Sequence, residues 1–473
     1  MAHPSAMQIR SDFLRLTSGA LAAAAFPLPA SADSPIGATI RVDQSSPSTK
    51  LDSAYAGFSF EKWLITQPYV RADNANLVGV FKSLGPSIIR VGGNSVDKNN
   101  RWRPGGAGGD VTETTKNDID RFAAFVHATG WRVMYGVNFA RQTAERSADE
   151  AAYAAAALGD SLAYVEIGNE CDRYPAIGYR PADWNEKNLV VEWLRYADAI
   201  RKRNPGVVFA GPSSAGQAQT WTAPFADDVG NQVALLTHHY YRGDGKRETS
   251  TGEMLMHPDP NLDTSLQVVQ AAAARNRIRD GYRFAEANNF YNGGRLGVSN
   301  GFVSALWSID FLFTNARYGS TGVNFHGGGN STGYTAIADD RRDVQELRPE
   351  FYGIFAFSRA ARGRLLASTL DAGDVNLSAY AVGARDGSTS LMFTNKDARA
   401  VAVTVDLGKP ASKATAYALT APSLDASTGL TFGGSPIALD GSWSPSKALV
   451  TPVRGSTISL TIPSASAVLV TAG

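Results

Sequence analysis

The stretch Ser147–Glu170, SADEAAYAAAALGDSLAYVEIGNE, indicates the fold class, because it joins one helix to one strand that ends in polar residues. Ser147 and Glu150 have the spacing of a capping box, so we expect a helix to begin there and to include Ala151–Leu158. The apolar run Ala163–Ile167 then predicts a buried strand. Repeated along a chain, such units predict a parallel sheet covered by helices.

Similar apolar runs of strand length occur throughout residues 51–362, with helical stretches between them. The predicted strands are Tyr55–Phe60, Ser87–Val91, Arg132–Val137, Ala163–Ile167, Val207–Ala210, Ala234–His239, Tyr282–Ala285 and Gly322–Phe325. The predicted helices include Glu186–Arg203, Thr264–Arg275 and Phe302–Ala316. Eight such units over about 300 residues predict an α/β fold, a (β/α)8 TIM barrel, and favour it over the alternative of an open doubly wound sheet.

The sequence pattern changes in residues 363–473. Helical periodicity gives way to short alternating runs such as Leu377–Val382 and Ser390–Thr394, separated by Gly, Ser, Pro and Asp. This pattern is typical of an antiparallel β-sandwich, which we expect as an additional domain. Residues 33–50 contain one more candidate strand, Thr39–Asp43, which has no place in the barrel and is expected to join the sandwich.

Residues 1–32 have the pattern of a signal peptide. Arg10 and Arg15 precede the apolar run Leu16–Leu28, and Ala30-Ser31-Ala32 matches a cleavage site. The apolar run is too short to span a bilayer. We therefore expect export to the periplasm or the medium, the alternative being a disordered leader.

Composition narrows the possible functions. The chain has 473 residues, with 45 Lys+Arg and 44 Asp+Glu, so its formal net charge is +1. A general binder of nucleic acid or of anionic membranes needs a large basic excess, so we expect neither as a partner. The His238-His239 pair suggests a metal site, but neighbouring strand residues point to opposite faces, and the six histidines show no ligand spacing. We expect no metal and no cofactor.

Two carboxylates end predicted barrel strands. Glu170 follows the fourth strand and Glu286 the seventh, and the chemistry of such barrels lies at the C-terminal ends of the strands. These two strands lie on opposing parts of the rim, so the side chains can face each other. Glycoside hydrolysis needs this pair, because one acid protonates the leaving oxygen while one carboxylate attacks the anomeric carbon.

The two strand ends resemble a known family. Val165-Glu-Ile-Gly-Asn-Glu170 and Glu286-Ala-Asn-Asn-Phe-Tyr291-Asn-Gly293-Gly294 are similar to the motifs of glycoside hydrolase family 79, which belongs to clan A of retaining enzymes. That family contains β-glucuronidases and heparanases, and its β-sandwich includes one short N-terminal strand. The resemblance covers essentially the whole mature chain. One position departs from it: Cys171 follows Glu170 where the family more often has Pro, which puts the shape of that loop in question.

The resemblance implies a role for each matching residue. Glu170 would be the general acid/base, Glu286 the nucleophile, and Asn169 a hydrogen-bond partner of the sugar 2-OH. The family's pocket for the C6 carboxylate of the sugar is matched by Tyr291, Tyr334, Asn292 and Gly293.

Three further sets of strand-end residues are candidates. Tyr240 or Tyr241 is expected to contact the nucleophile, and the sequence does not choose between them. Glu61 could bind a sugar hydroxyl, and Asn94 could line the sugar site or brace the rim.

These residues predict a retaining exo-β-glucuronidase that removes terminal β-linked glucuronic acid from glycans or glycoconjugates by double displacement. An endo-acting, heparanase-like enzyme is the first alternative and would need an open cleft with a basic rim. A neutral-sugar β-glycosidase of the same clan is the second, for which Tyr291 and Tyr334 would have no carboxylate to bind. A non-catalytic carbohydrate-binding protein is the third, although it would not need both Glu170 and Glu286.

Overall fold

The computed structural model describes residues 36–329 and 333–473. The predicted signal peptide, residues 1–32, lies outside the described residues. Within the described ranges, no helix combines the length and the apolar character needed to cross a membrane.

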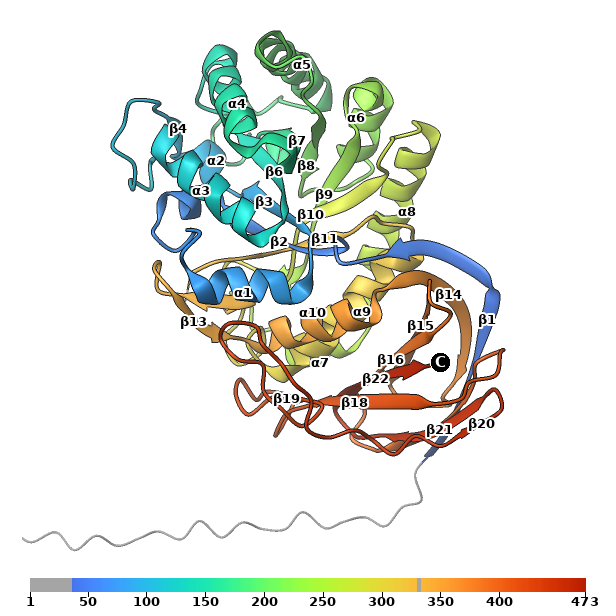
Figure 1. Cartoon of the computed structure of the whole chain (residues 1–473). Helices are drawn as coiled ribbons and strands as arrows, with labels where there is room; N and C mark the ends of the chain where they lie inside the picture. The colour runs from blue at the N-terminus through green and yellow to red at the C-terminus, as the bar shows by residue number, and fades with distance from the viewer. Residues whose placement is uncertain (1–35, 330–332) are drawn as a thin grey trace, which may run out of the picture. The chain divides into compact units, whose positions relative to one another are not determined.

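Eight parallel strands form a closed barrel, in the spatial order β10-β11-β2-β3-β6-β7-β8-β9 (Figure 1). They are β2 (Ala56–Glu61), β3 (Ile88–Gly92), β6 (Arg132–Val137), β7 (Leu162–Ile167), β8 (Phe209–Ser214), β9 (Leu235–Asp244), β10 (Tyr282–Tyr291) and β11 (Val323–Gly327). All eight predicted runs are strands of this barrel, so the predicted TIM barrel is confirmed and the open sheet is wrong. Strands β9 and β10 extend beyond the predicted runs, and their extra residues reach the mouth of the barrel.

Helices cover the outside of the barrel strands. In the described chain they are α1 (Ala75–Leu84), α2 (Ser95–Lys98), α3 (Lys116–Thr129), α4 (Ala144–Leu158), α5 (Glu186–Arg203), α6 (Thr222–Val229), α7 (Gly252–Met256), α8 (Pro260–Arg275), α9 (Phe302–Arg317) and α10 (Pro349–Ala360). Helix α5 has the predicted bounds, because the Asn185 side chain caps its first turn and basic residues occupy its last.

Helix α4 begins earlier than its sequence suggests. Its N-cap is Thr143, whose hydroxyl accepts a hydrogen bond from the backbone N–H three residues later. Ser147 lies one turn inside the helix and donates to the Asn138 carbonyl at 2.6 Å. Glu150 is buried against the Lys62 ammonium at 2.6 Å. The predicted capping box is therefore wrong, because both side chains connect the helix to neighbouring strand ends instead.

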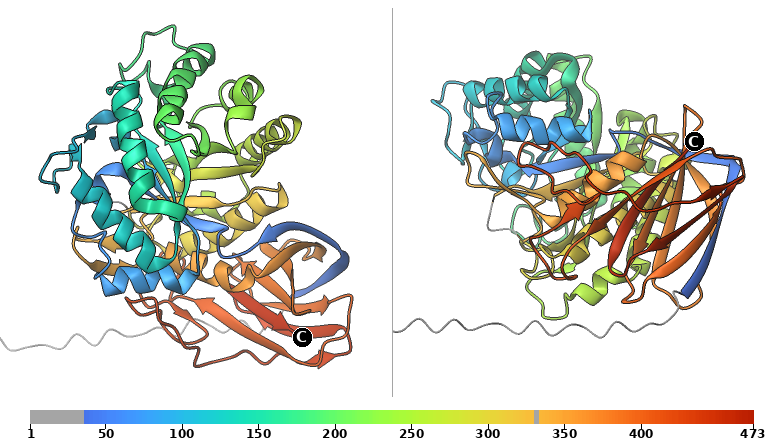
Figure 2. Two further views of the ribbon diagram at one scale, coloured as in Figure 1. Left: turned by 45° about the horizontal axis from the view of Figure 1, so that its top comes forward. Right: turned by 60° about the horizontal axis from the view of Figure 1, so that its bottom comes forward.

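The remaining strands form a β domain beside the barrel, as Figure 2 shows. They are β1 (Ile36–Leu51), β14 (Gly363–Asp371), β15 (Leu377–Ala384), β16 (Thr389–Asn395), β17 (Val401–Asp406), β18 (Ala414–Thr420), β19 (Thr431–Phe432), β20 (Val453–Arg454), β21 (Thr457–Ile462) and β22 (Ser466–Ala472). Two short pairs, β4 (Arg101–Trp102) with β5 (Glu113–Thr114) and β12 (Ile337–Asp339) with β13 (Val344–Leu347), lie outside both sheets.

The sheet of the β domain is continuous. Its ten strands are hydrogen-bonded in the order β19-β18-β22-β16-β15-β14-β1-β17-β21-β20. The predicted additional β domain is confirmed, whereas its division into the two sheets of a sandwich is not. The sheet curls around its own apolar core, in which Ile40, Phe393 and Val403 are buried. The N-terminal strand β1 pairs with both β14 and β17, so the chain before the barrel does join this domain.

Candidate active site

Glu286 lies in the middle of β10 with its side chain only 5% exposed. One carboxylate oxygen accepts a hydrogen bond from Arg90 at 2.7 Å and the other from the Tyr241 hydroxyl at 2.8 Å. Burial by itself raises the pKa of Glu286, but the charges of His326, His239 and Arg90 and the hydrogen bond from Tyr241 lower it to about 2. The Glu286 carboxylate is therefore ionised at neutral pH.

The fully buried Arg90, on β3, organises the floor of the mouth. Its guanidinium donates to two carboxylates at 2.7 Å, those of Glu166 and Glu286. It also donates to one amide oxygen and two hydroxyls, those of Asn169, Ser59 and Ser213. All five N–H groups of the planar Arg90 guanidinium thus have an acceptor, and its rigid geometry fixes the positions of these acceptors relative to one another.

Glu170 stands at the opposite side of the mouth, just after β7. Its backbone has φ = +48°, a left-handed conformation that costs a non-glycine residue about 1–2 kcal/mol. The preceding Gly168 also has positive φ, and a Cβ there would lie 2.8 Å from the Cys171 sulfur. Cys171 is buried and begins a short 3-10 helix, Cys171–Arg173, so its small thiol fits the space beneath this turn. The Glu170 side chain is 17% exposed, more than that of Glu286.

A chain of hydrogen bonds connects Arg90 to Glu170. Arg90 donates to the Ser213 hydroxyl at 2.9 Å, and this hydroxyl lies 2.6 Å from Nε2 of His239. Nδ1 of His239 lies 3.0 Å from a Glu170 oxygen. Because a carboxylate oxygen accepts, Nδ1–H of His239 donates to Glu170. A single arginine thus contacts Glu286 directly and Glu170 through Ser213 and His239.

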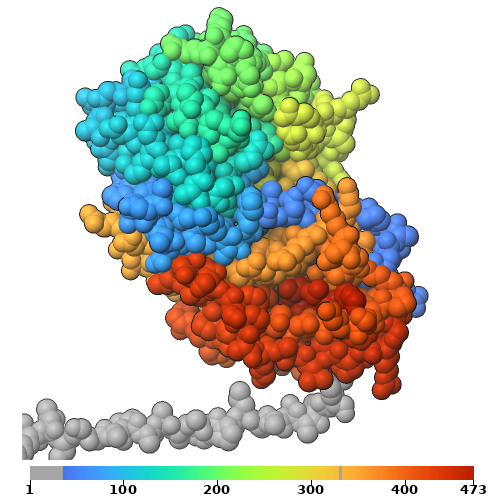
Figure 3. Space-filling view, in the orientation of Figure 1, coloured from blue at the N-terminus to red at the C-terminus, as the bar shows by residue number. Residues whose placement is uncertain are grey.

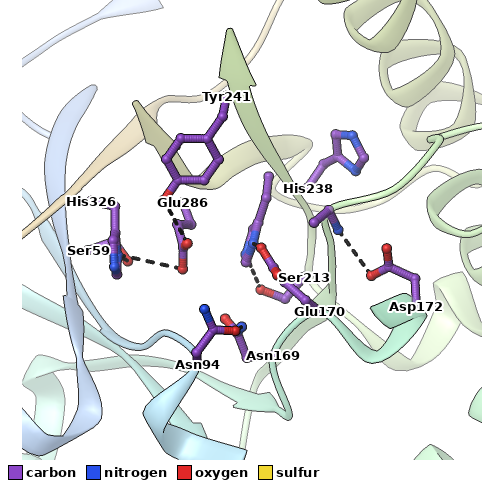
Figure 4. A network of polar contacts seen from close by, with 12 residues as sticks. Ser59, Asn94, Asn169, Glu170, Asp172, Ser213, His238, Tyr241, Glu286 and His326 are labelled. Carbon is purple, nitrogen blue, oxygen red and sulfur yellow. Dashed lines mark hydrogen bonds and ion pairs between the residues drawn. The ribbon is translucent and has the colours of Figure 1, made fainter. Parts of the chain in front are cut away.

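The two carboxylates are close together. One oxygen of Glu170, one oxygen of Glu286 and a ring nitrogen of His239 all lie within 4.8 Å of one another. In Figure 4 the Tyr241 hydroxyl points at Glu286, and Glu170 lies beside Ser213 on the other side of the mouth. The three groups have the geometry to hold a metal ion, but both oxygens of Glu286, both ring nitrogens of His239 and one oxygen of Glu170 already have partners in the protein. The expectation that no metal or cofactor is used stays a prediction.

His326, at the end of β11, is the other close neighbour of Glu286. Its Nδ1 lies 3.6 Å from a Glu286 oxygen and 3.1 Å from the Ser59 hydroxyl. Burial lowers the pKa of His326, but the carboxylates of Glu286 and Glu61 outweigh this and raise it. A protonated imidazole here adds positive charge on the Glu286 side of the mouth.

The orientation of the Asn169 side chain follows from its partners. Its amide oxygen accepts from Arg90 at 2.7 Å, so its amide nitrogen faces Asn94, 3.5 Å away, and the mouth. Its backbone N–H donates to the buried Asp97 carboxylate at 2.8 Å. Glu61 accepts hydrogen bonds from the backbone N–H groups of Asn94 and Ser95, which fixes the turn between β3 and α2. Glu61 thus braces the edge of the mouth, and the expectation that Glu61 and Asn94 contact the sugar stays a prediction.

The alternation of side chains along β9 distinguishes the two tyrosines. Tyr241 contacts Glu286, whereas Tyr240 points outward and donates to Asp259 at 2.7 Å. Tyr240 is therefore outside the mouth, and its inclusion among the sugar-binding residues is wrong. His238 also points away, as Figure 4 shows, and bonds Thr222. Burial lowers the pKa of His238 to about 3, so this imidazole is neutral.

Two of the residues expected to bind the sugar carboxylate lie beside Tyr241. The ring centres of Tyr291 and Tyr334 lie 6.1 and 6.2 Å from that of Tyr241. Asn292 directs its side chain to Asp244, at 2.8 Å, and the space where a Cβ of Gly293 would stand is open. The two tyrosines therefore lie on the Glu286 side of the mouth.

A cavity adjoins this side of the mouth. Its volume is about 390 Å³, and its walls include Glu61, His326 and Tyr334. It is within the range of small-ligand pockets, roughly 300–1,000 Å³.

Sequence reasoning missed His239, Ser213 and His326. Residues two apart on a strand share a face, so the sequence places His239 on the same face as Tyr241, but it does not show which face of the strand points inward. Nothing in the local sequence marks Ser213, because its importance comes from two partners on other strands.

No protein-family model matches this chain. A β-glucuronidase of Aspergillus niger is 28% identical over 259 residues, which cover 49% of this chain and 47% of the relative. A β-glucuronidase of Neurospora crassa is 26% identical over 364 residues, which cover 67% of this chain and 65% of the relative. The chain thus matches between about half and two thirds of the length of these relatives.

Solved structures share the architecture. A 4-O-α-L-rhamnosyl-β-D-glucuronidase from Fusarium oxysporum 12S has a TM-score of 0.76 at 18% identity, covering 92% of this chain and all of that one. A GH51 arabinofuranosidase from Xanthomonas axonopodis pv. citri has a TM-score of 0.67 at 17% identity, covering 93% of this chain and all of that one. The fold is therefore that of clan A-like glycoside hydrolases with an additional β domain.

Proposed function

We propose that this protein is a retaining exo-β-glucuronidase. The observation that carries the proposal is the pair of Glu170 and Glu286, whose carboxylate oxygens come within 4.8 Å of each other across the barrel mouth. Retaining glycosidases hold their two carboxyl groups about 5–5.5 Å apart, whereas inverting enzymes need roughly 6.5–9.5 Å to admit a water. The names of the two relatives supply the substrate class.

The surroundings of the two carboxylates support different roles. Glu286, held ionised by its cationic neighbours, is suited to attack the anomeric carbon. Glu170 has no Lys or Arg within ion-pair distance in the described chain and contacts an imidazole, so it is suited to donate a proton to the leaving oxygen. In the second step Glu170 takes a proton from a water whose oxygen attacks the anomeric carbon; the bond from that carbon to Glu286 breaks, and the sugar is released.

Asn169 is placed to assist the transition state. Because Arg90 occupies its amide oxygen, its amide nitrogen remains to donate to the sugar 2-OH. Hydrogen bonds to the 2-OH that strengthen towards the transition state are worth several kcal/mol in this chemistry.

For the sugar carboxylate we propose a site formed by Tyr291, Tyr334 and the backbone at Asn292-Gly293. Burial, reinforced by the charge of Glu286, raises the pKa of Tyr334, so its hydroxyl keeps its proton and can donate. The cavity beside Tyr334 supports a pocket that takes a terminal sugar. We further propose membership of glycoside hydrolase family 79, and export after removal of residues 1–32, from the sequence motifs alone.

The test compares hydrolysis of aryl β-glucuronide, β-glucoside and β-xyloside, while NMR follows the anomer of the released sugar. We expect a strong preference for the glucuronide and β-glucuronic acid as the first product. Glu286→Gln, prepared in parallel, controls for contaminating activity. A preference for a neutral sugar would overturn the carboxylate site, and an α-anomer as first product would overturn retention. Cleavage of uronate polymers without hydrolysis of aryl glycosides would favour an endo-acting enzyme.

A further inference from the structure

A second cavity lies at the opposite end of the barrel from Glu170 and Glu286. Its volume is about 870 Å³. One wall consists of the chain entering β2 and β3, including Asp52 and Pro86, and the other of strands β14 and β15. Because active sites of such barrels lie at the C-terminal ends of the strands, this cavity is separate from the mouth. The six residues of β2 span roughly 20 Å between the two.

The walls of this cavity are strongly basic. Seven of the lining residues are Lys or Arg, and one, Asp52, is acidic. The whole chain has a formal net charge of only +1, so the cavity concentrates positive charge that the rest of the molecule balances. Figure 3 shows the blue segment before β2 and the orange start of the β domain side by side on the viewer's face, where they form the two walls.

Most of this charge is not neutralised within the protein. Lys50 pairs with Asp52 at 2.5 Å. Three other cations of the cavity donate to backbone carbonyls, which leaves their net charge in place: Arg359, Arg364 and Lys409.

The remaining three cations have no partner in residues 36–329 and 333–473. The exposed side chains of Lys82, Arg362 and Arg385 make neither a hydrogen bond nor an ion pair there. Arg362 stands close enough to Arg359 to lower the pKa of Arg359, after the larger effect of burial, to about 10. Cations that are held close together despite their mutual repulsion create a positive potential, which attracts an anionic ligand into the cavity.

We propose that this basic cavity is a second carbohydrate-binding site, which holds an acidic polysaccharide through its uronate groups. The assignment to uronates rather than other anions rests on the proposed function. The described walls contain no aromatic side chain, so they offer no platform on which nucleic-acid bases stack. Binding here keeps a polymeric substrate at the enzyme surface and raises the local concentration of its chain ends.

The test uses the variant Lys82→Gln/Arg362→Gln/Arg385→Gln and oligogalacturonates, uronate chains that contain no β-glucuronide. Calorimetry at low salt should show binding to the parent protein, and at least about tenfold weaker binding to the triple variant. Higher salt should weaken binding to the parent. A matched variant, Lys202→Gln/Lys447→Gln/Arg454→Gln, loses the same charge at exposed positions outside the cavity and should bind like the parent.

Three results would overturn the proposal: no binding to the parent, equal binding by the parent and the cavity variant, or equally tight binding of a single-stranded DNA of the same charge. Hydrolysis of aryl β-glucuronide, measured separately, should be the same in the parent and both variants. If that hydrolysis is missing in all three, the proposed function fails, while the binding result still decides whether the cavity holds uronate chains.

Discussion

The two sides of the barrel mouth present the same side chain in opposite surroundings. Glu286 is nearly buried and receives hydrogen bonds from Arg90 and Tyr241, with His326 close by. Glu170 is more exposed and contacts His239. The difference teaches that a glutamate reaches the mouth because of its position in the strand sequence. Whether it stays ionised or can carry a proton depends on the charges of residues on neighbouring strands and on its exposure to solvent.

The largest effect should come from Glu286→Gln, which removes the carboxylate proposed to attack the sugar while keeping the size of the side chain. We expect kcat for aryl β-glucuronide to fall by at least about 10⁴-fold. Circular dichroism should confirm that the variant is folded. A decrease below tenfold would place the nucleophile elsewhere and remove the distinction between the two sides.

Glu170→Gln should have the next largest effect, and it should depend on the leaving group. We expect kcat to fall by about 10²–10⁴-fold for a poor leaving group such as an alkyl alcohol. For a nitrophenol, which leaves without a proton, the first step should be nearly unaffected, and a burst of product should appear because deglycosylation is slowed. An equal loss for both kinds of substrate would contradict the assignment of Glu170 as general acid.

Tyr241→Phe tests the electrostatics of the Glu286 side. A hydrogen bond to a charged group is worth about 1.5–3 kcal/mol, so we expect a loss of about 10- to 100-fold in kcat/KM. The Tyr241 hydroxyl lowers the pKa of Glu286, so its removal raises that pKa. The loss of activity on the acid side should then begin at higher pH. Tyr240→Phe, one residue away but bonded to Asp259, is the matched control and should leave the pH profile unchanged.

The pKa of Glu286 also predicts a pH dependence of stability. Because it is lowered from an ordinary value of 4.5 to about 2, the ionised carboxylate stabilises the folded protein fully above pH 4.5. This contribution is lost as the pH falls through about 2. Urea unfolding of the parent and of Glu286→Gln at several pH values should show the difference between them shrinking towards acid. A difference that stays constant would contradict the lowered pKa.

The smallest effect should follow removal of metal ions. Since both oxygens of Glu286, both ring nitrogens of His239 and one oxygen of Glu170 already have partners, we expect dialysis against EDTA to leave kcat unchanged. Loss of activity that Zn²⁺ or Mn²⁺ restores would show that the three residues form a metal site.

The fold was largely predictable because its signals are local. The apolar runs of the barrel strands and the periodicity of Glu186–Arg203 can be recognised from neighbouring residues alone. The start of α4 could not be predicted in this way. Ser147 is a residue type that often caps helices, but its hydroxyl donates to the Asn138 carbonyl instead. The continuity of the ten-stranded sheet was not predictable either, since alternation along a strand does not reveal its neighbours.

By itself, the sequence determined the eight strands, the added β domain and the two glutamates at strand ends, because these depend on periodicity and on the order of residues. The tertiary structure decided that Tyr241 rather than Tyr240 faces Glu286, that Arg90 contacts both sides of the mouth, and that seven basic residues of the cavity meet at the far end of the barrel. These features depend on electrostatic and hydrogen-bonding distances of a few ångströms between residues far apart in the chain, which only the folded backbone fixes.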